Sequence, residues 1–367
     1  MAKYRVGIIG HTGRGNYGHG LDIPWQHRED CEVVALADPH DGGREAGLKR
    51  TGAAKGYADY RKMLQAERLN IAVICPRWID QHRDLAIACA EHGCHIYMEK
   101  PFCQTLAQAD EVVQACEMRH LKFAIAHTNR YSPVLGVVKR LIREGEIGDV
   151  LEVRARGKED TRRGGGEDLW VLGTHMLDLT RALVGDAESC FATVRQDGKP
   201  VTKEHVAEGN EGIGPLAGDH IQATYRFKNG VTGYFASKRG AGGGAGRFGL
   251  QICGSRGMIE MQSGYLKPAY LLKDPAWSPG RTGSKWEVIT SGGVGKPEPI
   301  TEGGHDGGNE SAAADLISSI EGDRQPISSV YDARSATELI VATFESHRVG
   351  GPVSLPLENR QNPLKML

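Results

Sequence analysis

Residues 5–18 read RVGIIGHTGRGNYG, an apolar run that ends in glycine and continues into a glycine-rich turn. A short apolar run with this ending predicts a buried β-strand. Gly13, Gly15 and Gly18 have the spacing GxGxxG, in which missing side chains let backbone N–H groups and a helix N-terminus approach a pyrophosphate. The motif alone is weak, but its place after a first strand favours a dinucleotide-binding domain. Counted from Gly10, the turn is longer than usual, so the spacing does not assign each glycine its role.

Strand-like and helix-like segments alternate up to about residue 127. Apolar β-rich runs predict strands at residues 5–10, 31–38, 71–75, 95–98 and 123–126. Helical periodicity between them predicts helices at residues 58–66, 81–92 and 106–119. Such alternation predicts βαβ units around a doubly wound parallel sheet, which we assign to residues 1–127.

After residue 127 the pattern changes to β-rich runs with few helices between them. The runs predict strands at 150–156, 190–195, 220–227, 231–237, 248–252 and 258–262, and helices at 134–144, 168–184, 309–320 and 331–347. Asn229-Gly230 is a hairpin signal between two of the strands. We expect an α/β domain with a large, mostly antiparallel open sheet over residues 128–345, glycine-rich loops at 240–247 and 291–308, and a C-terminal tail at 346–367.

The composition is that of an ordinary globular protein, with 367 residues, 40% hydrophobic and 25% charged, and a formal net charge of −1. This charge favours neither a nucleic-acid-binding nor a membrane-surface protein. We see no secretory signal and no apolar run near the ~20 residues needed to cross a bilayer, so we expect a cytoplasmic protein. The eight cysteines form no CxxC pair, which predicts reduced thiols and no metal site.

Asp38 ends the second predicted strand, 25 residues after Gly13. A carboxylate at this position can bind the ribose hydroxyls of a dinucleotide and repel a 2′-phosphate, which favours NAD over NADP. The alternative is a solvated turn residue that precedes Pro39.

Glu99-Lys100-Pro101 follows the strand predicted at 95–98, at the edge where a parallel sheet binds its ligands. Proline fixes φ and removes a donor, so it can pin the turn, and Lys100–Pro101 is a bond that adopts the cis form at modest cost. A lysine here can hydrogen-bond a substrate hydroxyl beside a nicotinamide. The alternative is a surface lysine in an ordinary turn.

These features occur in an order that resembles one family. The resemblance rests on the strand and glycine turn, His82 in QHRDLAIACAEHG, EKPF at 99–102, GTHMLD at 173–178 and DARSATELIVATFESHRVGGPVSLPL at 332–357. These are similar to the glucose-fructose oxidoreductase, inositol dehydrogenase and rhizopine catabolism (Gfo/Idh/MocA) family over essentially the whole chain. The resemblance implies a Rossmann domain joined to an α/β domain whose open sheet makes oligomer contacts. It also implies NAD(P)-dependent oxidation or reduction of a sugar or cyclitol carbon, with Lys100 and His175 in the active site.

Histidine suits the proton transfer that accompanies hydride transfer, because it titrates near neutral pH. His175 lies in a predicted helix with Asp178 three residues further on, and a packing histidine is the alternative. The family often has an Asp four residues before this histidine, where this chain has Val171. Glu167 or Asp168 can supply a displaced carboxylate, or Asp168 simply caps the helix.

Other residues are expected around the same crevice. Pro76, Arg77 and Trp78 lie in a loop that resembles the family's cofactor-bordering loop, and Arg77 either reaches a phosphate or lies in solvent. Arg162 belongs to a charged loop, at 159–163, that is alternatively only solvated. The expected cofactor-binding residues are Gly10, Gly13, Gly15, Asp38, Pro76, Trp78, His82, Glu99 and Asn129. The expected substrate-binding residues are Lys100, Arg130, Arg162, Asp168 and His175.

We therefore expect an NAD-dependent oxidoreductase, with NADP less favoured, that acts on a secondary alcohol of a sugar, sugar derivative or cyclitol and forms a homodimer or homotetramer. Lys100 would polarise the hydroxyl and His175 would exchange its proton, with positioning rather than a metal supplying the rate. Val171 keeps a second hypothesis open, in which transient oxidation, elimination and re-reduction cleave a glycoside. A third hypothesis is an NAD-binding regulator without turnover.

Overall fold

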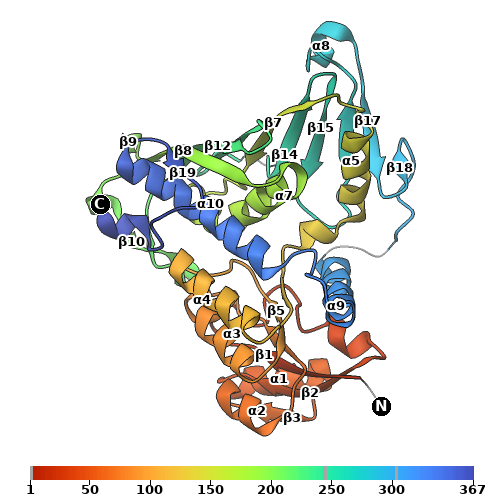
Figure 1. Cartoon of the computed structure of the whole chain (residues 1–367), viewed down its shortest axis with the longest axis vertical. Helices are drawn as coiled ribbons and strands as arrows, with labels where there is room; N and C mark the ends of the chain where they lie inside the picture. Colours follow the sequence, from red (N-terminus) through yellow and green to blue (C-terminus); the bar gives the residue numbers. More distant parts are fainter. Residues whose placement is uncertain (1–2, 243–245, 302–304) are drawn as a thin grey trace. The chain divides into compact units, whose positions relative to one another are not determined.

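The computed structural model describes residues 3–242, 246–301 and 305–367, and the chain divides into two compact units (Figure 1). The first unit comprises residues 1–128, 210–214 and 305–337, and the second comprises 129–209, 215–304 and 338–367. Each unit draws on more than one stretch of chain, unlike the contiguous domains 1–127 and 128–345 expected from the sequence. Periodicity predicts that a segment is a helix or a strand, but it does not say which core that element joins.

In its described part, the first unit contains a six-stranded parallel sheet with the order β3-β2-β1-β4-β5-β6. The strands are β1 (Tyr4–Ile9), β2 (Cys31–Ala37), β3 (Lys55–Tyr57), β4 (Ile71–Ile74), β5 (His95–Met98) and β6 (Phe123–Ile125). The strand order reverses between β1 and β4, and sheets of this kind bind ligands outside the carboxyl ends of their strands at such a point. The predicted doubly wound sheet is confirmed.

The helices of the first unit are α1 (Asp41–Thr51), α2 (Tyr60–Ala66), α3 (His82–Glu91), α4 (Leu106–Glu117) and α9 (His305–Glu321), and α10 (Val330–Val349) begins in it. Sequence periodicity does not predict α1 or β3. The sequence of α1 is DGGREAGLKRT, and only Gly47 and Thr51 in it are buried, so the helix has no apolar face to detect. β3 has three residues and pairs with one neighbour at the edge of the sheet.

The segment between β1 and β2 differs from the expectation. Residues 10–30 are all described, and they form successive turns and one short 3-10 helix, η1 (Pro24–His27), without an α-helix. Five glycines in residues 10–20 and the proline at 24 explain this, because inside a helix a glycine costs about 1 kcal/mol and a proline about 3 kcal/mol relative to alanine. The helix N-terminus that usually follows a GxGxxG motif is therefore absent from residues 10–30 of this chain.

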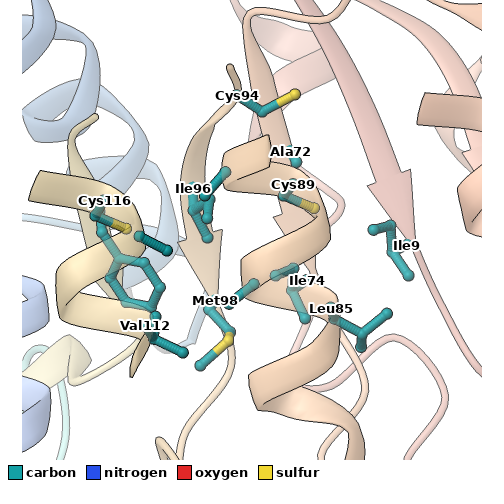
Figure 2. Packing of buried hydrophobic residues seen from close by; sticks show 14 of the residues in the cluster. Ile9, Ala72, Ile74, Leu85, Cys89, Cys94, Ile96, Met98, Val112 and Cys116 are labelled. Atoms are coloured by element: carbon teal, nitrogen blue, oxygen red, sulfur yellow. The ribbon is translucent and has the colours of Figure 1, made fainter. Parts of the chain in front are cut away.

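The core of the first unit lies between the sheet and helices α3 and α4 (Figure 2). Ile74, Ile96 and Met98 on neighbouring strands are fully buried, in one cluster with Leu85 of α3 and Val112 of α4. Burial of each such side chain contributes about 1.5–3 kcal/mol. The same cluster takes up cysteines as small apolar residues, namely Cys89, Cys94, Cys103 and Cys116.

The C-terminal third of the chain completes the first unit. The N–H of Ile125 donates to the carbonyl oxygen of Ser328 at 2.9 Å, and Ala124 and Ser329 form an isolated antiparallel bridge. Residues 328–329 therefore cover backbone groups of β6, a strand at the edge of the sheet. A further link is made by the buried side chain of Asn309 in α9, which accepts a hydrogen bond from the Tyr97 hydroxyl at 2.7 Å.

The described residues of the second unit form an eleven-stranded sheet with the order β18-β17-β16-β15-β14-β7-β13-β12-β8-β19, to which β9 adds on β8. The pair β7–β13 is parallel and the other pairs are antiparallel, so the predicted mostly antiparallel sheet is confirmed. The strands are β7 (Val150–Arg156), β8 (Ala187–Gln196), β9 (Lys199–Pro200), β12 (His220–Phe227), β13 (Thr232–Lys238), β14 (Gly249–Gly254), β15 (Gly257–Gln262), β16 (Ala269–Leu272), β17 (Trp286–Thr290), β18 (Gly293–Val294) and β19 (Val353–Ser354).

The remaining elements of the second unit are short. Its helices are α5 (Pro133–Arg143), α6 (Gly166–Asp168), a π-helical turn η4 (Leu169–Gly173), α7 (Thr174–Val184), α8 (Pro279–Thr282) and the end of α10, and β10 (Ala207–Glu208) pairs with β11 (Pro215–Leu216). The expected loop at 291–308 is wrong in part, because β18 lies within it and α9 begins at residue 305. In the other expected loop, at 240–247, residues 243–245 lie outside the described residues.

The predicted hairpin at Asn229-Gly230 joins β12 and β13. Gly230 has φ 86° and its N–H donates to the carbonyl oxygen of Phe227 at 2.9 Å, while the N–H of Phe227 donates to Val231 at 2.9 Å. This is a three-residue loop in which glycine supplies the left-handed conformation that the turn requires.

One face of the second sheet is open. The strand register places Phe191, Thr224, Tyr234, Arg154, Gln251, Glu260, Tyr270 and Val288 side by side in one row across it. Phe191 is 49% exposed, Tyr234 is 40% exposed and Val288 is 36% exposed. A hollow of about 680 Å³ lies on this face over β7, β13, β14 and β15.

Candidate functional site

Several loops of the first unit meet at the carboxyl ends of β1, β4 and β5. A pocket of about 200 Å³ lies at the point where the strand order reverses. It is lined by Ile9, Gly10, His11, Ala37, Pro39, Ala58, Asp59, Tyr60, Arg61, Pro76, Gln81 and Leu85. Of the expected cofactor-binding residues, Gly10 and Pro76 line this pocket.

The glycine turn is shaped by contacts with its neighbours. Gly13 has φ 90°, Gly15 has φ 91° and Gly18 has φ 62°, which are conformations that L side chains rarely adopt. A Cβ on Gly15 would lie 2.4 Å from the backbone nitrogen of Arg77, and one on Gly18 would lie 2.5 Å from the Glu99 carboxylate. The glycines therefore let this turn pack closely against the loops that follow β4 and β5.

The first backbone donors of the turn are used within the unit. The N–H of His11 donates to the Asn16 carbonyl at 3.1 Å, the N–H of Gly13 donates to the Asn16 side chain at 3.1 Å, and the N–H of Arg14 donates to the His11 carbonyl at 3.0 Å. The N–H of Thr12 donates to the Asp38 carboxylate. Residues 11–16 thus close on themselves instead of presenting a row of N–H groups.

Asp38 is fully buried, and its carboxylate is saturated. It accepts hydrogen bonds from the Thr12 N–H at 3.1 Å, the Thr12 hydroxyl at 2.8 Å and the His40 N–H at 2.9 Å. These hydrogen bonds engage the carboxylate within the unit, and the expected contact of Asp38 with a ribose stays a prediction. Its carboxylate holds the glycine turn against the start of α1.

The Glu99-Lys100-Pro101 turn follows β5 as expected, and the Lys100–Pro101 peptide bond is cis. The Glu99 carboxylate is buried and accepts hydrogen bonds from the backbone N–H of His19 at 3.1 Å and from the backbone N–H of Lys100 at 3.0 Å, while Nδ1 of the His19 ring lies 3.0 Å from it. Burial raises the pKa of Glu99, but the His19 ring and the charge of Lys100 outweigh this and lower it to about 2. Glu99 is therefore an ionised anchor beside Lys100, which is itself 5% exposed.

A second hydrogen bond fixes His19 from the other side. The Asn309 side-chain amide donates to the carbonyl oxygen of His19 at 2.9 Å, and Asn309 accepts from the Tyr97 hydroxyl. A chain of hydrogen bonds thus links Tyr97 of β5 through Asn309 of α9 to His19, which contacts Glu99 in the Lys100 turn. The sequence alone gives no pairing for His19 or Asn309, because their partners lie 80 and 212 residues away.

His82 links two of the loops. Its Nε2 lies 2.7 Å from the carbonyl oxygen of Pro76, and its Nδ1 lies 2.8 Å from that of Pro101 and 3.1 Å from that of Phe102. The ring is fully buried. His82 therefore positions the loops after β4 and β5 relative to each other, and its expected contact with a cofactor stays a prediction.

Trp78 is covered by a side chain of the glycine turn. The Arg14 guanidinium lies 4.6 Å from the centre of the Trp78 ring and forms an ion pair with Asp80. Arg77, between Pro76 and Trp78, has no hydrogen bond or ion pair with any described residue, and its Nε is buried.

In the second unit, the half-buried His175 is the second residue of α7, directly after the π-helical turn that contains Val171. Arg130 donates from Nε to both carboxylate oxygens of Asp178, at 2.9 and 2.8 Å. The Arg130 side chain is 10% exposed and that of Asp178 is 1% exposed. Arg130 thus forms a buried ion pair that holds the helix of His175, and its expected contact with substrate stays a prediction.

Asp168 is also a structural residue. Its carboxylate accepts from the Ser237 hydroxyl at 2.5 Å and from the N–H groups of Glu159 at 3.0 Å and Lys158 at 3.2 Å, and it is fully buried. Burial raises its pKa, against the effect of these hydrogen bonds. Its side chain makes no capping hydrogen bond to the helix, so the capping alternative is not supported, and its expected contact with substrate stays a prediction.

Asn129 and Arg162 have different environments. The Asn129 amide donates to Ser263 at 3.1 Å and accepts from the Gly264 N–H at 2.9 Å, so it holds the turn after β15, and its expected contact with a cofactor stays a prediction. The Arg162 side chain is 62% exposed and lies 3.9 Å from the Glu167 carboxylate. The charged loop of Arg162 is not simply solvated, since Glu159 in it is fully buried.

The described residues contain no group of three or more His, Cys, Asp or Glu side chains arranged to hold a metal ion. None of the described helices combines the length and the hydropathy required to cross a membrane.

A parallel sheet with a pocket at its switch point defines a dinucleotide-binding α/β protein. Residues 4–127 match the family model described as oxidoreductase family, NAD-binding Rossmann fold, and residues 139–355 match the model described as oxidoreductase family, C-terminal alpha/beta domain. The chain belongs to the Gfo/Idh/MocA oxidoreductase family. The resemblance seen in the sequence is thereby confirmed.

Individual relatives are distant. The levoglucosan dehydrogenase of Pseudarthrobacter phenanthrenivorans is 26% identical over 62% of this chain and 64% of its own length. The D-apiose dehydrogenase of Paraburkholderia graminis is 31% identical over 50% of this chain and 51% of its own. The chain thus spans about half to two thirds of the length of these curated relatives. A solved levoglucosan dehydrogenase in complex with NADH and levoglucosan superposes with a TM-score of 0.77 at 21% identity, over 96% of this chain and 99% of that one, and shows the same fold.

Proposed function

We propose that this protein is an NAD-dependent oxidoreductase that transfers hydride between nicotinamide and a secondary alcohol of a sugar, sugar derivative or cyclitol. The observation that carries the proposal is Lys100, held by an ionised Glu99 at the carboxyl end of β5 in a Rossmann unit. The names of the sugar dehydrogenases among its relatives support the substrate class.

The pocket between β1 and β4 fits part of a dinucleotide. Its volume of about 200 Å³ is below the roughly 300–1,000 Å³ of pockets that enclose a drug-sized ligand, so it suits the adenosine portion. Gly10 and Pro76 would border that portion, and Arg77 offers a guanidinium that no described residue occupies. When bound, the nicotinamide ring accepts or returns the hydride of the substrate carbon. Asp38 favours NAD over NADP only weakly, because its carboxylate is buried and hydrogen-bonded to Thr12 and His40.

Lys100 would polarise the reacting hydroxyl through its ammonium group. Its backbone N–H donates to Glu99, which itself is fixed by His19, so the turn is preorganised before substrate arrives. His175 would exchange the hydroxyl proton, and Arg162 would bind other hydroxyl groups of the substrate.

Activity on a panel of polyols and sugars, followed as NADH absorbance together with product analysis, tests the proposal. We expect NADH to accumulate in proportion to a ketone product. A protein that binds NAD and turns over no member of a broad panel would instead support the regulatory hypothesis.

A second candidate reaction is favoured by one residue. Val171 is 4% exposed and apolar where the family often has Asp, so the usual carboxylate is missing next to His175. Transient oxidation followed by elimination and re-reduction would cleave a glycoside without net NADH formation. Release of an aglycone from a chromogenic glycoside at constant NADH would identify this reaction.

The open face of the second sheet supports a homodimer or homotetramer. Its exposed Phe191, Tyr234 and Val288 lie in one row, and a second copy of the same face can cover them. Light scattering on the purified protein tests this assembly.

A further inference from the structure

The chain lacks the usual means of binding a pyrophosphate. In GxGxxG domains the anion rests on the N-terminus of the helix that follows the glycine turn. Here residues 10–30 form no α-helix, and the N–H groups of residues 11–14 are donated to Asn16, Asp38 and His11. A strongly anionic group placed over this turn therefore needs positive charge from elsewhere.

Two arginines lie at the turn, and they differ in their partners. Arg14 forms an ion pair with Asp80 and stacks on Trp78, although its Nε atom is also buried without a hydrogen-bond partner. Arg77 makes no hydrogen bond, ion pair or ring contact with the described residues, although its Nε atom is buried. A buried N–H without a partner destabilises the protein by itself, so its retention calls for a ligand.

The position of Arg77 suits an anion at the turn. It follows β4, which pairs with β1 at the switch point, and its backbone nitrogen lies 2.4 Å from the place where Gly15 would carry a Cβ. Gly15 thus leaves no side chain between the turn and Arg77. A guanidinium is planar and presents paired N–H donors that match a phosphate.

We propose that Arg77 binds the pyrophosphate of the dinucleotide and replaces the missing helix N-terminus. This inference rests on the proposed function, because it presumes that a dinucleotide binds. On this inference, the role of Arg77 is to bind the pyrophosphate of the cofactor and not to take part in the chemistry.

The test is ligand binding by calorimetry with wild type, Arg77→Ala and Arg77→Lys. The probes are NADH, NADPH, ADP-ribose and adenosine. We expect Arg77→Ala to weaken NADH and ADP-ribose about 10- to 100-fold, as for loss of a charge-assisted hydrogen bond, and to change adenosine by less than about 2-fold. Arg77→Lys should restore part of the lost affinity, because lysine keeps the positive charge but lacks the paired N–H donors of a guanidinium.

Arg83→Ala is the matched control, since the Arg83 side chain on α3 is 40% exposed and paired with Glu111 and Asp84. It should leave all four affinities unchanged. Unchanged NADH affinity in Arg77→Ala would overturn the inference while leaving the proposed function intact. If Arg77→Ala weakened the binding of NADPH alone, the inference would also be overturned, because the guanidinium would then bind the 2′-phosphate and not the pyrophosphate. Absence of NADH, NADPH and ADP-ribose binding by the wild type would remove the proposed function together with the inference.

Discussion

The Nδ1 atom of His19 lies 3.0 Å from the carboxylate of Glu99. This contact joins the irregular segment after β1 to the turn of Lys100. The backbone N–H of His19 donates to the same carboxylate oxygen at 3.1 Å. The segment thus helps to hold the turn that carries Lys100.

Replacement of Glu99 by Gln should change how stability depends on pH. The folded-state pKa of Glu99 is lowered from 4.5 to about 2, so the ionised group stabilises the fold above pH 4.5, and this contribution is lost as the pH falls from about 4.5 to about 2. Its size is on the order of 3 kcal/mol. Denaturant unfolding of both proteins at several pH values should show a difference in unfolding free energy that shrinks with acidification. The exposed Glu45→Gln is the control, and a difference independent of pH would contradict the assignment.

Lys100→Ala and His175→Ala should each lower kcat by about 100- to 10,000-fold, the range typical of a lost general acid–base group. Affinity for NADH, measured by fluorescence titration, should change little in His175→Ala, since that residue acts on the substrate. Lys49→Ala, an exposed lysine on α1, serves as the matched control. Full activity in both variants would exclude these residues from the chemistry.

Disruption of the Arg130–Asp178 pair should destabilise the protein. Asp178→Ala leaves a buried guanidinium next to an apolar gap, which costs about 3–5 kcal/mol. The double variant Arg130→Met with Asp178→Leu removes both charges and should recover most of the lost free energy of unfolding. Urea unfolding measures both effects, and equal destabilisation by the single and double variants would show that the pair is not the cause.

Asp38→Asn should affect folding more than cofactor choice. The variant weakens the hydrogen bonds from Thr12 and His40, which should lower the unfolding free energy by about 1–3 kcal/mol. The ratio of NAD to NADP affinity should stay within about 3-fold of wild type. The control is Asp41→Asn, whose carboxylate is exposed. A large gain in NADP affinity would show that Asp38 faces the ribose after all.

A charge on the open sheet face should prevent assembly. Tyr234→Lys places an ammonium group in the row that includes Phe191 and Val288, where burial against a second copy is unfavourable. We expect the variant to run as a monomer in light scattering. Met118→Lys is the control, because Met118 is 70% exposed on the first unit. Unchanged mass for Tyr234→Lys would rule out this face.

The sequence predicts the two sheets well, because buried strands have apolar runs that are readable without knowing their partners. It also predicts that Lys100 follows a strand of the parallel sheet, and the structure shows this turn directly after β5. A GxGxxG motif is usually followed by a helix, but in this chain the additional glycines and Pro24 disfavour one.

The polar residues are harder to predict, because each one's role depends on a distant partner. Asp38 is paired with Thr12, 26 residues away, Arg130 with Asp178, 48 residues away, and Asn129 with Ser263, 134 residues away. A polar residue at the end of a strand looks the same in the sequence whether its side chain binds a ligand or stabilises a turn. Only the three-dimensional partner distinguishes them.

The cover that Ser328 and Ser329 provide for β6 has a consequence for biosynthesis. When residues 1–128 leave the ribosome, the strand at the edge of their sheet still lacks the segment that will seal it, and nearly the whole polypeptide must be translated before that segment appears. The nascent amino-terminal third therefore passes through a period in which β6 is open to other chains, and this is when a chaperone would be of most use.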